Sequence, residues 1–261
     1  MQTILTKYIN YKNIKLGVIV FLTKHKSIFL PILFILSYAL LYFIVDHSSQ
    51  SLVAHDEGLY ARRSRLVEET SNWFSPPFIS PHHKTIGSYW FIALSIKLFG
   101  KSELALRLPS ILASFICLFL SYFIALKISN KKSALISVFS LSSMPLWIQY
   151  SRYASPDILF VLCILLVILF FLKFVVSSQA KHKYFYIFIS GVFISISFFI
   201  RSYMVLVPLI GLIPFFGYQL LRSKKIFINF FLSGILIGSF PTFLSLFFSY
   251  RQFGVGGIYS L

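Results

Sequence analysis

The sequence predicts an all-α membrane protein with about seven transmembrane helices, and three observations lead to this fold class. Hydrophobic residues make up 57% of the 261 residues, charged residues only 12%, and the mean hydropathy is +0.82. Apolar runs recur along the chain, several of them near the ~20 residues that cross a bilayer as a helix. Lys and Arg gather in small groups between these runs. Together these features are typical of a polytopic membrane protein.

The apolar runs predict the elements in chain order. Residues 13–22 are too short to cross, and residues 86–100 are short and carry Lys97, so we expect both to lie in the plane of the interface. Tyr89 and Trp90 of the second segment suit headgroup depth. The first long run has no small-residue cleavage site close behind it, so it predicts an uncleaved span. The seven expected spans are 28–45, 108–126, 133–149, 157–176, 184–200, 204–221 and 226–248.

The distribution of Lys and Arg predicts the orientation. Basic residues fill the N-terminal segment 1–27 and alternate loops, which places these parts in the cytoplasm. Every acidic residue then falls on the external side, which leaves a nearly acid-free cytoplasmic face and a polar external face. The acids are Asp46, Asp56, Glu57, Glu68, Glu69, Glu103 and Asp157.

The chain reads as a single membrane domain, residues 1–261, with a long first external loop at 46–107. Pro76, Pro77 and Pro81 divide this loop into short interfacial helices, and long structured loops usually carry function. The formal charge of +17 is dispersed between apolar runs, which excludes a contiguous nucleic-acid-binding face. The repeats of many transporters, a P-loop, a dinucleotide fingerprint and zinc-ligand spacing are all missing from the sequence.

Three acids are candidates for chemistry. Asp56 and Glu57 follow the first span, where they are either the hydrated edge of a membrane segment or a site in which one carboxylate acts as a general base. Asp157 begins the span 157–176, where it either complements the helix dipole or binds substrate.

External cations and histidines complete the set of candidates. Lys84, Arg107, Arg152 and Arg201 lie at outer helix ends, where they either reach lipid phosphate or bind a substrate phosphate. Three histidines could bind a divalent cation, but no ligand spacing enforces it, so we assign no metal and require no cofactor. They are His55, His82 and His83.

The order of these motifs resembles the membrane glycosyltransferases of the GT-C class, and within it the bacterial protein-mannosyltransferase and aminoarabinose-transferase-like group. The resemblance rests on "HDEGLYA", "HHKTIGSYWFIALSIKLFGKSELALRLPS" and "QYSRYASPD", and it covers about residues 28–215. It implies a plasma (inner) membrane protein that transfers a sugar from a polyprenyl-phosphate carrier to a lipid, glycan or protein acceptor, with its active site on the outer face.

The resemblance also implies site residues. Asp56, supported by Glu57, corresponds to the essential acid of the first external loop, and Asp157 to the acid after the third span. The resemblance and the cationic chemistry together predict contacts to lipid phosphate or sugar. The residues expected to make them are Lys84, Arg201, Arg152, Arg107, Tyr60 and Tyr89.

Two departures from the resembling group leave alternatives open. His83 stands where an acid commonly precedes the lysine, and relatives continue through further spans, so we expect a missing C-terminal part or a partner chain that supplies it. The rival functions are a transporter or lipid flippase, and an inactive truncated membrane protein. Transporters tend to place acids near the bilayer midplane, whereas the acids here are expected at its boundary.

Overall fold

The computed structural model describes residues 35, 52, 56–79, 86–226, 228 and 231–259, and within them the chain forms helices and no strand. This confirms the all-α fold class. The predicted segment 13–22, and the first span apart from Ile35, lie outside the described residues. The helices are α2 (Asp56–Thr70), α3 (Gly87–Phe99), α4 (Glu103–Ile128), α5 (Lys131–Ser143), α6 (Pro145–Arg152), α7 (Asp157–Val176), α8 (Ala180–Arg201), η1 (Ser202–Val205), α9 (Leu206–Ile226), α10 (Leu232–Gly238), α11 (Phe240–Phe253) and α12 (Gly256–Tyr259).

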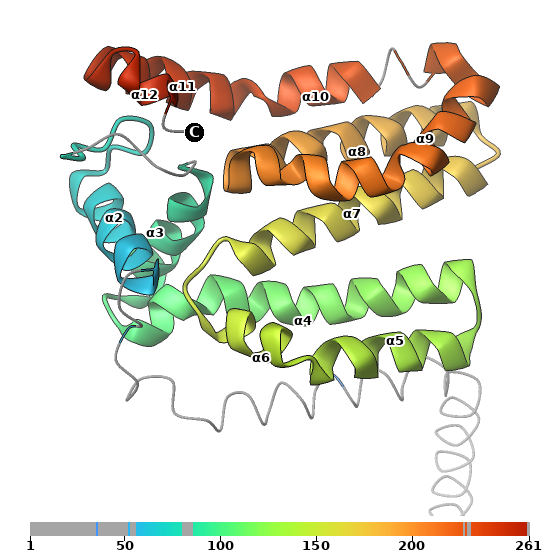
Figure 1. Cartoon of the computed structure of the whole chain (residues 1–261), viewed down its shortest axis with the longest axis horizontal. Coiled ribbons are helices and arrows are strands. Elements are labelled where there is room, and N and C mark those ends of the chain that lie inside the picture. Colours follow the sequence, from blue (N-terminus) through green and yellow to red (C-terminus); the bar gives the residue numbers. More distant parts are fainter. Residues whose placement is uncertain are drawn as a thin grey trace, which may run out of the picture.

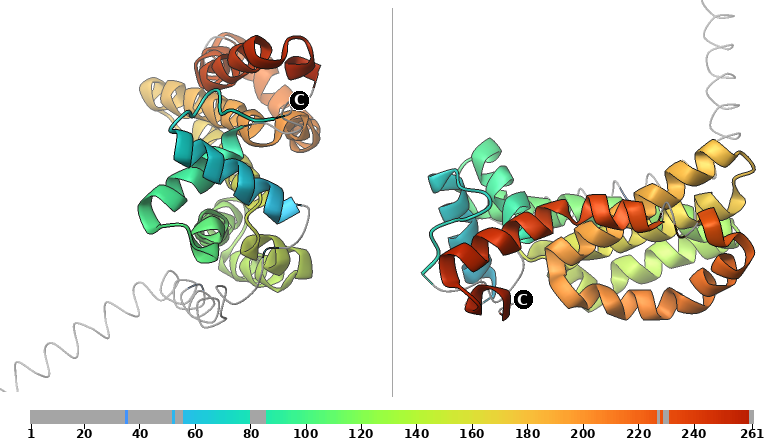
Figure 2. Two further views of the ribbon diagram at one scale, coloured as in Figure 1. Left: turned by 90° about the vertical axis from the view of Figure 1, so that its left-hand side faces the viewer. Right: turned by 90° about the horizontal axis from the view of Figure 1, so that it is seen from above.

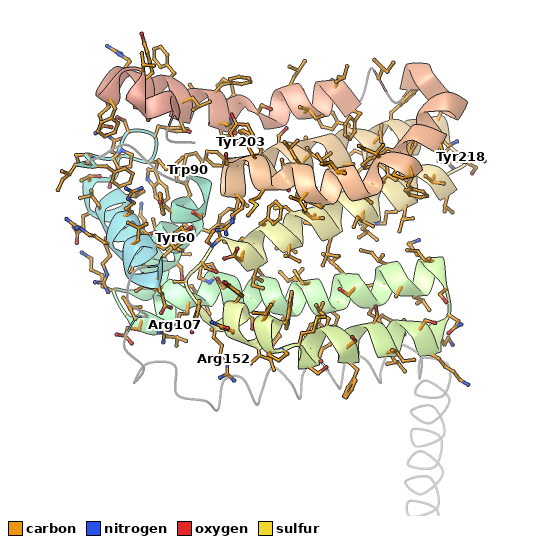
Figure 3. All side chains as sticks on the ribbon, viewed as in Figure 1. Tyr60, Trp90, Arg107, Arg152, Tyr203 and Tyr218 are labelled. Atoms are coloured by element: carbon orange, nitrogen blue, oxygen red, sulfur yellow. The ribbon has the colours of Figure 1, made fainter. Side chains whose placement is uncertain are left out.

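The long helices run back and forth along one axis, and α2 and α3 cover one end of the bundle (Figure 1). The end view in Figure 2 shows α2 and α3 crossing in front of the longer helices. We call this end the α2 end; it comprises α2, α3, residues 71–79, residues 153–156 and the junction of α8 with η1. Figure 3 shows Tyr60, Trp90, Arg107, Arg152 and Tyr203 toward this end and Tyr218 toward the opposite end.

Three described helical segments are long and apolar enough to cross a membrane: 103–128, 157–176 and 180–218. A fourth span is possible if the bent pair α10 and α11 counts as one. The predicted span 157–176 coincides with α7, and 108–126 and 184–200 lie inside α4 and α8. The described residues therefore support a multi-pass protein, while the count of seven spans stays a prediction.

Two predicted spans are broken by proline. The segment 133–149 is not one helix, because α5 ends at Ser143 and α6 begins at Pro145. Met144 between them is extended (φ −67°, ψ 126°), which is the conformation that a following proline favours. The segment 226–248 is likewise divided at Ser239, just before Pro241, with a bend of 43°.

Small residues bring α8 and α10 into close contact. A Cβ atom built on Gly191 would lie 2.6 Å from the Phe231 carbonyl oxygen, and one on Gly234 would collide with the Phe188 carbonyl oxygen. The hydroxyl of Ser195 donates to the Ile235 carbonyl at 2.8 Å. Gly234 and Gly238 form the small-xxx-small pattern that lets membrane helices approach closely.

The described core lies in three clusters. One lies among α4, α5 and α7, a second joins α2 and α3, and a third joins α7, α8 and α9. Cys117 and Cys163 are buried, unpaired members of the first cluster, as expected for apolar packing residues.

Candidate functional site at the α2 end

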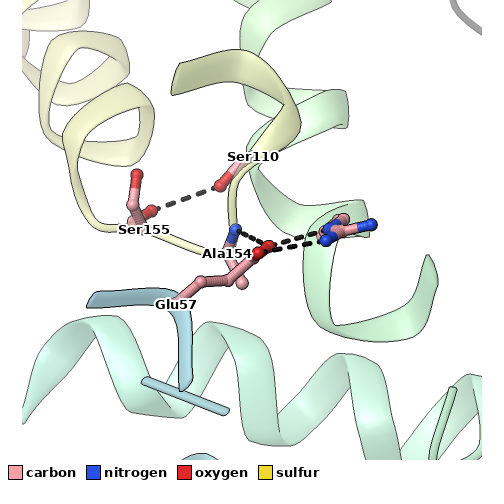
Figure 4. A network of polar contacts seen from close by, with 5 residues as sticks. Glu57, Ser110, Ala154 and Ser155 are labelled. Carbon is pink, nitrogen blue, oxygen red and sulfur yellow. Dashed lines mark hydrogen bonds and ion pairs between the residues drawn. The ribbon is translucent and has the colours of Figure 1, made fainter. Parts of the chain in front are cut away.

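The first turn of α2 carries Asp56 and Glu57, where negative charge is favoured by the helix dipole. Glu57 is 2% exposed, and both of its oxygens are used. Arg107 of α4 donates from Nε to Oε1 at 2.7 Å and from Nη2 to Oε2 at 3.0 Å. The backbone N–H of Ala154 donates to Oε1 at 3.0 Å. Figure 4 shows this carboxylate lying between α4 and the α6–α7 loop.

The Glu57–Arg107 pair is a two-point, charge-assisted contact, which is the strongest geometry available to these side chains. Its burial is compensated because the carboxylate also accepts the Ala154 N–H. Ser110 of α4 adds a hydrogen bond from its hydroxyl to the Ser155 carbonyl at 3.2 Å. Together these contacts fix residues 154–155, and hence the chain that enters α7 at Asp157.

Asp157 and Arg201 form a second ion pair at this end, with Arg201 Nη2 3.0 Å from Asp157 Oδ1. Asp157 begins α7 and Arg201 ends α8, so each charge complements the dipole of its own helix. The side chains are 30% and 25% exposed, in contrast to 1% and 3% for Glu57 and Arg107. The Asp157–Arg201 pair therefore remains accessible to a polar ligand, whereas the Glu57–Arg107 pair is enclosed.

Ser202 makes the turn that places Arg201. Its φ of +53° lies in the left-handed region, which a non-glycine residue adopts at some cost. The Ser202 N–H continues the hydrogen bonding of α8 by donating to the Phe198 carbonyl. The chain then turns through η1 into α9.

The remaining predicted site residues are distributed unevenly. The backbone of Asp56 lies in α2 beside Glu57, whereas Lys84 and the three histidines lie outside the described residues. Arg152 ends α6 and points away from α4 in Figure 3. Tyr60 and Tyr89 are 1% and 0% exposed with ring centroids 5.6 Å apart. They pack between α2 and α3, and their contact with substrate stays a prediction.

Several contacts that hold this end together could not be predicted from the sequence. Trp90 donates from Nε1 to the Trp73 carbonyl at 2.6 Å and packs edge-on against Phe199, with ring centroids 5.0 Å apart. Gln252 of α11 donates to the Pro76 and Phe78 carbonyls at 3.3 and 3.4 Å. Residues 73–78 are thereby fastened to α3 and α11. Only the tryptophans carried a sequence signal, as interfacial aromatics.

A metal centre is not formed within the described part of the chain, where no group of three or more His, Cys, Asp or Glu side chains could hold an ion. His55, His82 and His83 are not covered by this search, so a divalent cation stays a prediction.

Comparisons with known proteins place this arrangement among membrane glycosyltransferases. The family model for dolichyl-phosphate-mannose-protein mannosyltransferase matches residues 83–244. An undecaprenyl phosphate-alpha-4-amino-4-deoxy-L-arabinose arabinosyl transferase of Pseudomonas paraeruginosa is 28% identical over 120 residues, which are 45% of this chain and 22% of that protein. The enzyme of the same description from Erwinia tasmaniensis is 26% identical over 192 residues, 72% of this chain and 34% of that protein.

The fold is shared with ArnT from Cupriavidus metallidurans. Its apo crystal structure superposes with a TM-score of 0.72 at 18% identity, covering 85% of this chain and 42% of ArnT. Its structure bound to undecaprenyl phosphate gives a TM-score of 0.71 with the same coverage. The chain thus spans less than half the length of these relatives.

Proposed function

The chain belongs to the dolichyl-phosphate-mannose-protein mannosyltransferase family, and from this premise we propose that it transfers a sugar from a polyprenyl-phosphate carrier to an acceptor. The names of its relatives specify an undecaprenyl-phosphate donor, and one solved relative binds undecaprenyl phosphate. Because the chain covers 42% of ArnT, we propose that additional C-terminal residues or a partner chain complete the cavity for the lipid.

One observation carries the proposal: the buried Glu57–Arg107 pair fixes the α6–α7 loop, which leads directly into the exposed Asp157–Arg201 pair. The start of α2, a further acid (Asp157) and a cation of a phosphate-binding type (Arg201) thereby lie at one end of the bundle. Such a set can remove a proton from an acceptor and stabilise a phosphate leaving group.

In the proposed reaction Asp56 takes the proton from a hydroxyl or amine of the acceptor. The acceptor atom bonds to the anomeric carbon of the sugar as the bond from that carbon to the phosphate oxygen breaks, with inversion. The electron pair of the broken bond stays on the polyprenyl phosphate, where Arg201 and Lys84 stabilise the developing charge. Arg152 is the reserve cation. A phosphate acceptor would need no base, and Asp56 would then orient it.

Glu57 and Arg107 act in this proposal through position. Their charges are satisfied by each other and by Ala154, so they hold the start of α2 and the loop before Asp157 in register. Asp157 orients the Arg201 guanidinium, which has five N–H donors and can contact phosphate while it is paired. Tyr60 and Tyr89 support the α2–α3 surface behind the site.

We place the site at the external membrane face, with the N-terminal segment in the cytoplasm. In support, the described acids lie in α2 or at the first residues of α4 and α7, next to the α2 end, while Lys127, Lys131 and Lys181 lie at helix ends away from it. The positive-inside rule assigns that opposite end to the cytoplasm. Among the described residues no acid lies in the apolar middle of α4, α7 or α8, which disfavours an ion-coupled transporter.

The test uses membranes from cells that produce the chain, so that any partner remains present. Labelled undecaprenyl-phosphate-linked aminoarabinose and mannose are supplied separately, and transfer of label to envelope lipids, glycans and proteins is measured. We expect transfer from at least one donor, and a loss of about 10²–10⁴-fold in Asp56→Asn.

Asp46→Asn is the matched control, because it makes the same chemical change at another expected external acid. If Asp56→Asn transferred sugar as well as the wild type, Asp56 could not be the general base. No transfer from either donor, together with envelope glycans that are unchanged by deleting the gene, would overturn the proposed function.

A further inference from the structure

A hollow of about 280 Å³ lies against one face of α2. Leu59, Arg62, Arg63 and Leu66 line it with the spacing i, i+3, i+4, i+7, and Phe78 and Ile79 form its other wall. At ~100° per residue this face points about 180° away from Glu57. The hollow is therefore separate from the Glu57–Arg107 pair on the same helix.

Arg63 is a buried cation within this hollow. The residue is 8% exposed, and its guanidinium carbon lies 5.1 Å from the centroid of Phe78 and 5.9 Å from that of Tyr89. Its Nη1 donates to the Tyr89 hydroxyl at 3.3 Å. Stacking on rings holds the guanidinium in place but does not neutralise its charge, and buried charges are generally paired.

The carboxylates described around α2 are engaged by other cations. Glu57 pairs with Arg107, and Lys101 contacts Glu69 at 2.6 Å and Glu68 at 3.6 Å. Among the side chains that the structure describes, no ion pair joins a carboxylate to Arg62 or Arg63. The hollow therefore carries an excess of positive charge at its arginines.

A second hollow of about 430 Å³ adjoins the first and shares Arg62, Leu66 and Ile79 with it. It adds Arg65, whose buried Nε has no hydrogen-bond partner among the described atoms, and Glu69, whose carboxylate is paired with Lys101. Ile79 at the shared rim is 89% exposed. Guanidinium donors beside an exposed apolar rim suit a ligand with an anionic head and an apolar body.

We propose that these two hollows on α2 bind a phosphate group, as carried by the headgroup of an anionic lipid. Arg62 and Arg63 contact the phosphate oxygens, Arg65 adds a third guanidinium at the second hollow, and Leu59, Leu66 and Ile79 contact the glycerol or upper acyl region. The site is distinct from the one proposed for sugar transfer, and it fixes α2 at the membrane surface.

The test is native mass spectrometry of the full chain released from phosphatidylcholine nanodiscs that contain or lack phosphatidylglycerol. We expect the wild-type chain to retain phosphatidylglycerol. Arg63→Gln should retain it about tenfold more weakly, because each charge-assisted hydrogen bond contributes strongly to the binding free energy of the lipid. Arg62→Gln changes an exposed position and guards against misfolding of the Arg63 variant, and Arg63→Lys should restore only part of the retention.

Lys127→Gln removes the same charge from the far end of α4 and serves as the matched control. Retention that falls no further in the Arg62 and Arg63 variants than in this control would overturn the site. Added inorganic phosphate distinguishes a site for free phosphate from a site for the lipid headgroup. Displacement of the lipid by phosphate indicates that the site recognises phosphate alone. Loss of the lipid only by mutation indicates that it recognises the whole headgroup.

Discussion

Glu57 and Arg107 lie 50 residues apart in the sequence and meet through two charge-assisted hydrogen bonds, at 2.7 and 3.0 Å. The same carboxylate accepts the backbone N–H of Ala154, which lies 97 residues from Glu57. One side chain thus joins the start of α2, the first turns of α4 and the loop between α6 and α7. The Glu57 and Arg107 side chains are only 1% and 3% exposed, so water cannot take the place of either one as the hydrogen-bond partner of the other.

Breaking this pair by removing one partner should strongly destabilise the protein. We expect Arg107→Met to lower the free energy of unfolding by about 3–5 kcal/mol, because it removes the guanidinium that pairs with a buried carboxylate. Thermal and denaturant unfolding in detergent micelles measure the loss. The double variant Glu57→Gln/Arg107→Met removes both charges and should recover part of it, and equal losses in the single and double variants would contradict this account.

The α8–α10 contact predicts opposite outcomes for two glycines. Gly234→Ala should destabilise the protein, because its Cβ would collide with the Phe188 carbonyl in a helix that cannot move away without losing the Ser195–Ile235 hydrogen bond. Gly211→Ala of α9 is the matched control, since nothing lies within 4 Å of its added Cβ. That variant should be neutral or gain up to about 1 kcal/mol of helix propensity. Similar melting temperatures for the two variants would rule out close packing at Gly234.

The contact between α2 and the α3–α4 turn should depend on acid pH. The hydrogen bond and charge of Lys101 lower the pKa of the Glu69 carboxyl from its ordinary value of 4.5. A carboxyl group whose pKa is lower in the folded than in the unfolded protein stabilises the folded state when the pH is above the unfolded-state pKa. This stabilisation is lost as the pH falls through the folded-state pKa. Hydrogen exchange around Thr70, corrected for intrinsic rates, should therefore speed up below about pH 4.5 in the wild type but not in Lys101→Met.

Much of the scaffold could be predicted because lipid solvation imposes simple rules on sequence. The bounds 157–176 of α7 follow from an apolar run that begins after Asp157, carries one charge at Lys173 and ends before Ser177. The breaks at Pro145 and Pro241 were equally available in the sequence, because proline lacks an N–H and restricts the preceding residue. The number of consecutive apolar residues does not reveal such breaks, so it predicts 133–149 and 226–248 as continuous spans.

The candidate site was predicted as a set of residues but not as a set of contacts. Helix ends and charge types pointed to Asp157 and Arg201, yet their pairing depends on how α7 and α8 pack. Glu57 and Arg107 were assigned to catalysis and phosphate binding, while the structure joins them to each other out of reach of solvent. A single sequence carries no signal for a contact between distant positions, and the same holds for Arg63 against Phe78.

The Asp157–Arg201 pair yields a prediction that depends on the proposed sugar transfer. If Asp157 orients the Arg201 guanidinium toward donor phosphate, Asp157→Asn and Arg201→Lys should each raise the KM for the polyprenyl-phosphate sugar by about tenfold, with little effect on stability. The stability effect is small because these side chains are 30% and 25% exposed, and ion pairs that contact solvent contribute about 0–1 kcal/mol. Arg201→Lys keeps the charge but loses the planar guanidinium, with which one side chain can contact both Asp157 and a phosphate.

Kinetics of the double variant distinguish orientation from direct contact. Two residues that act through one guanidinium should be non-additive, so Asp157→Asn/Arg201→Lys should raise the donor KM little more than either single change. Additive effects would show that the two residues act separately. A fall in kcat for Asp157→Asn at an unchanged donor KM would instead assign Asp157 to the acceptor. In that case the ion pair at the start of α7 would serve to hold the second substrate, and Arg201 would be positioned by the turn at Ser202 alone.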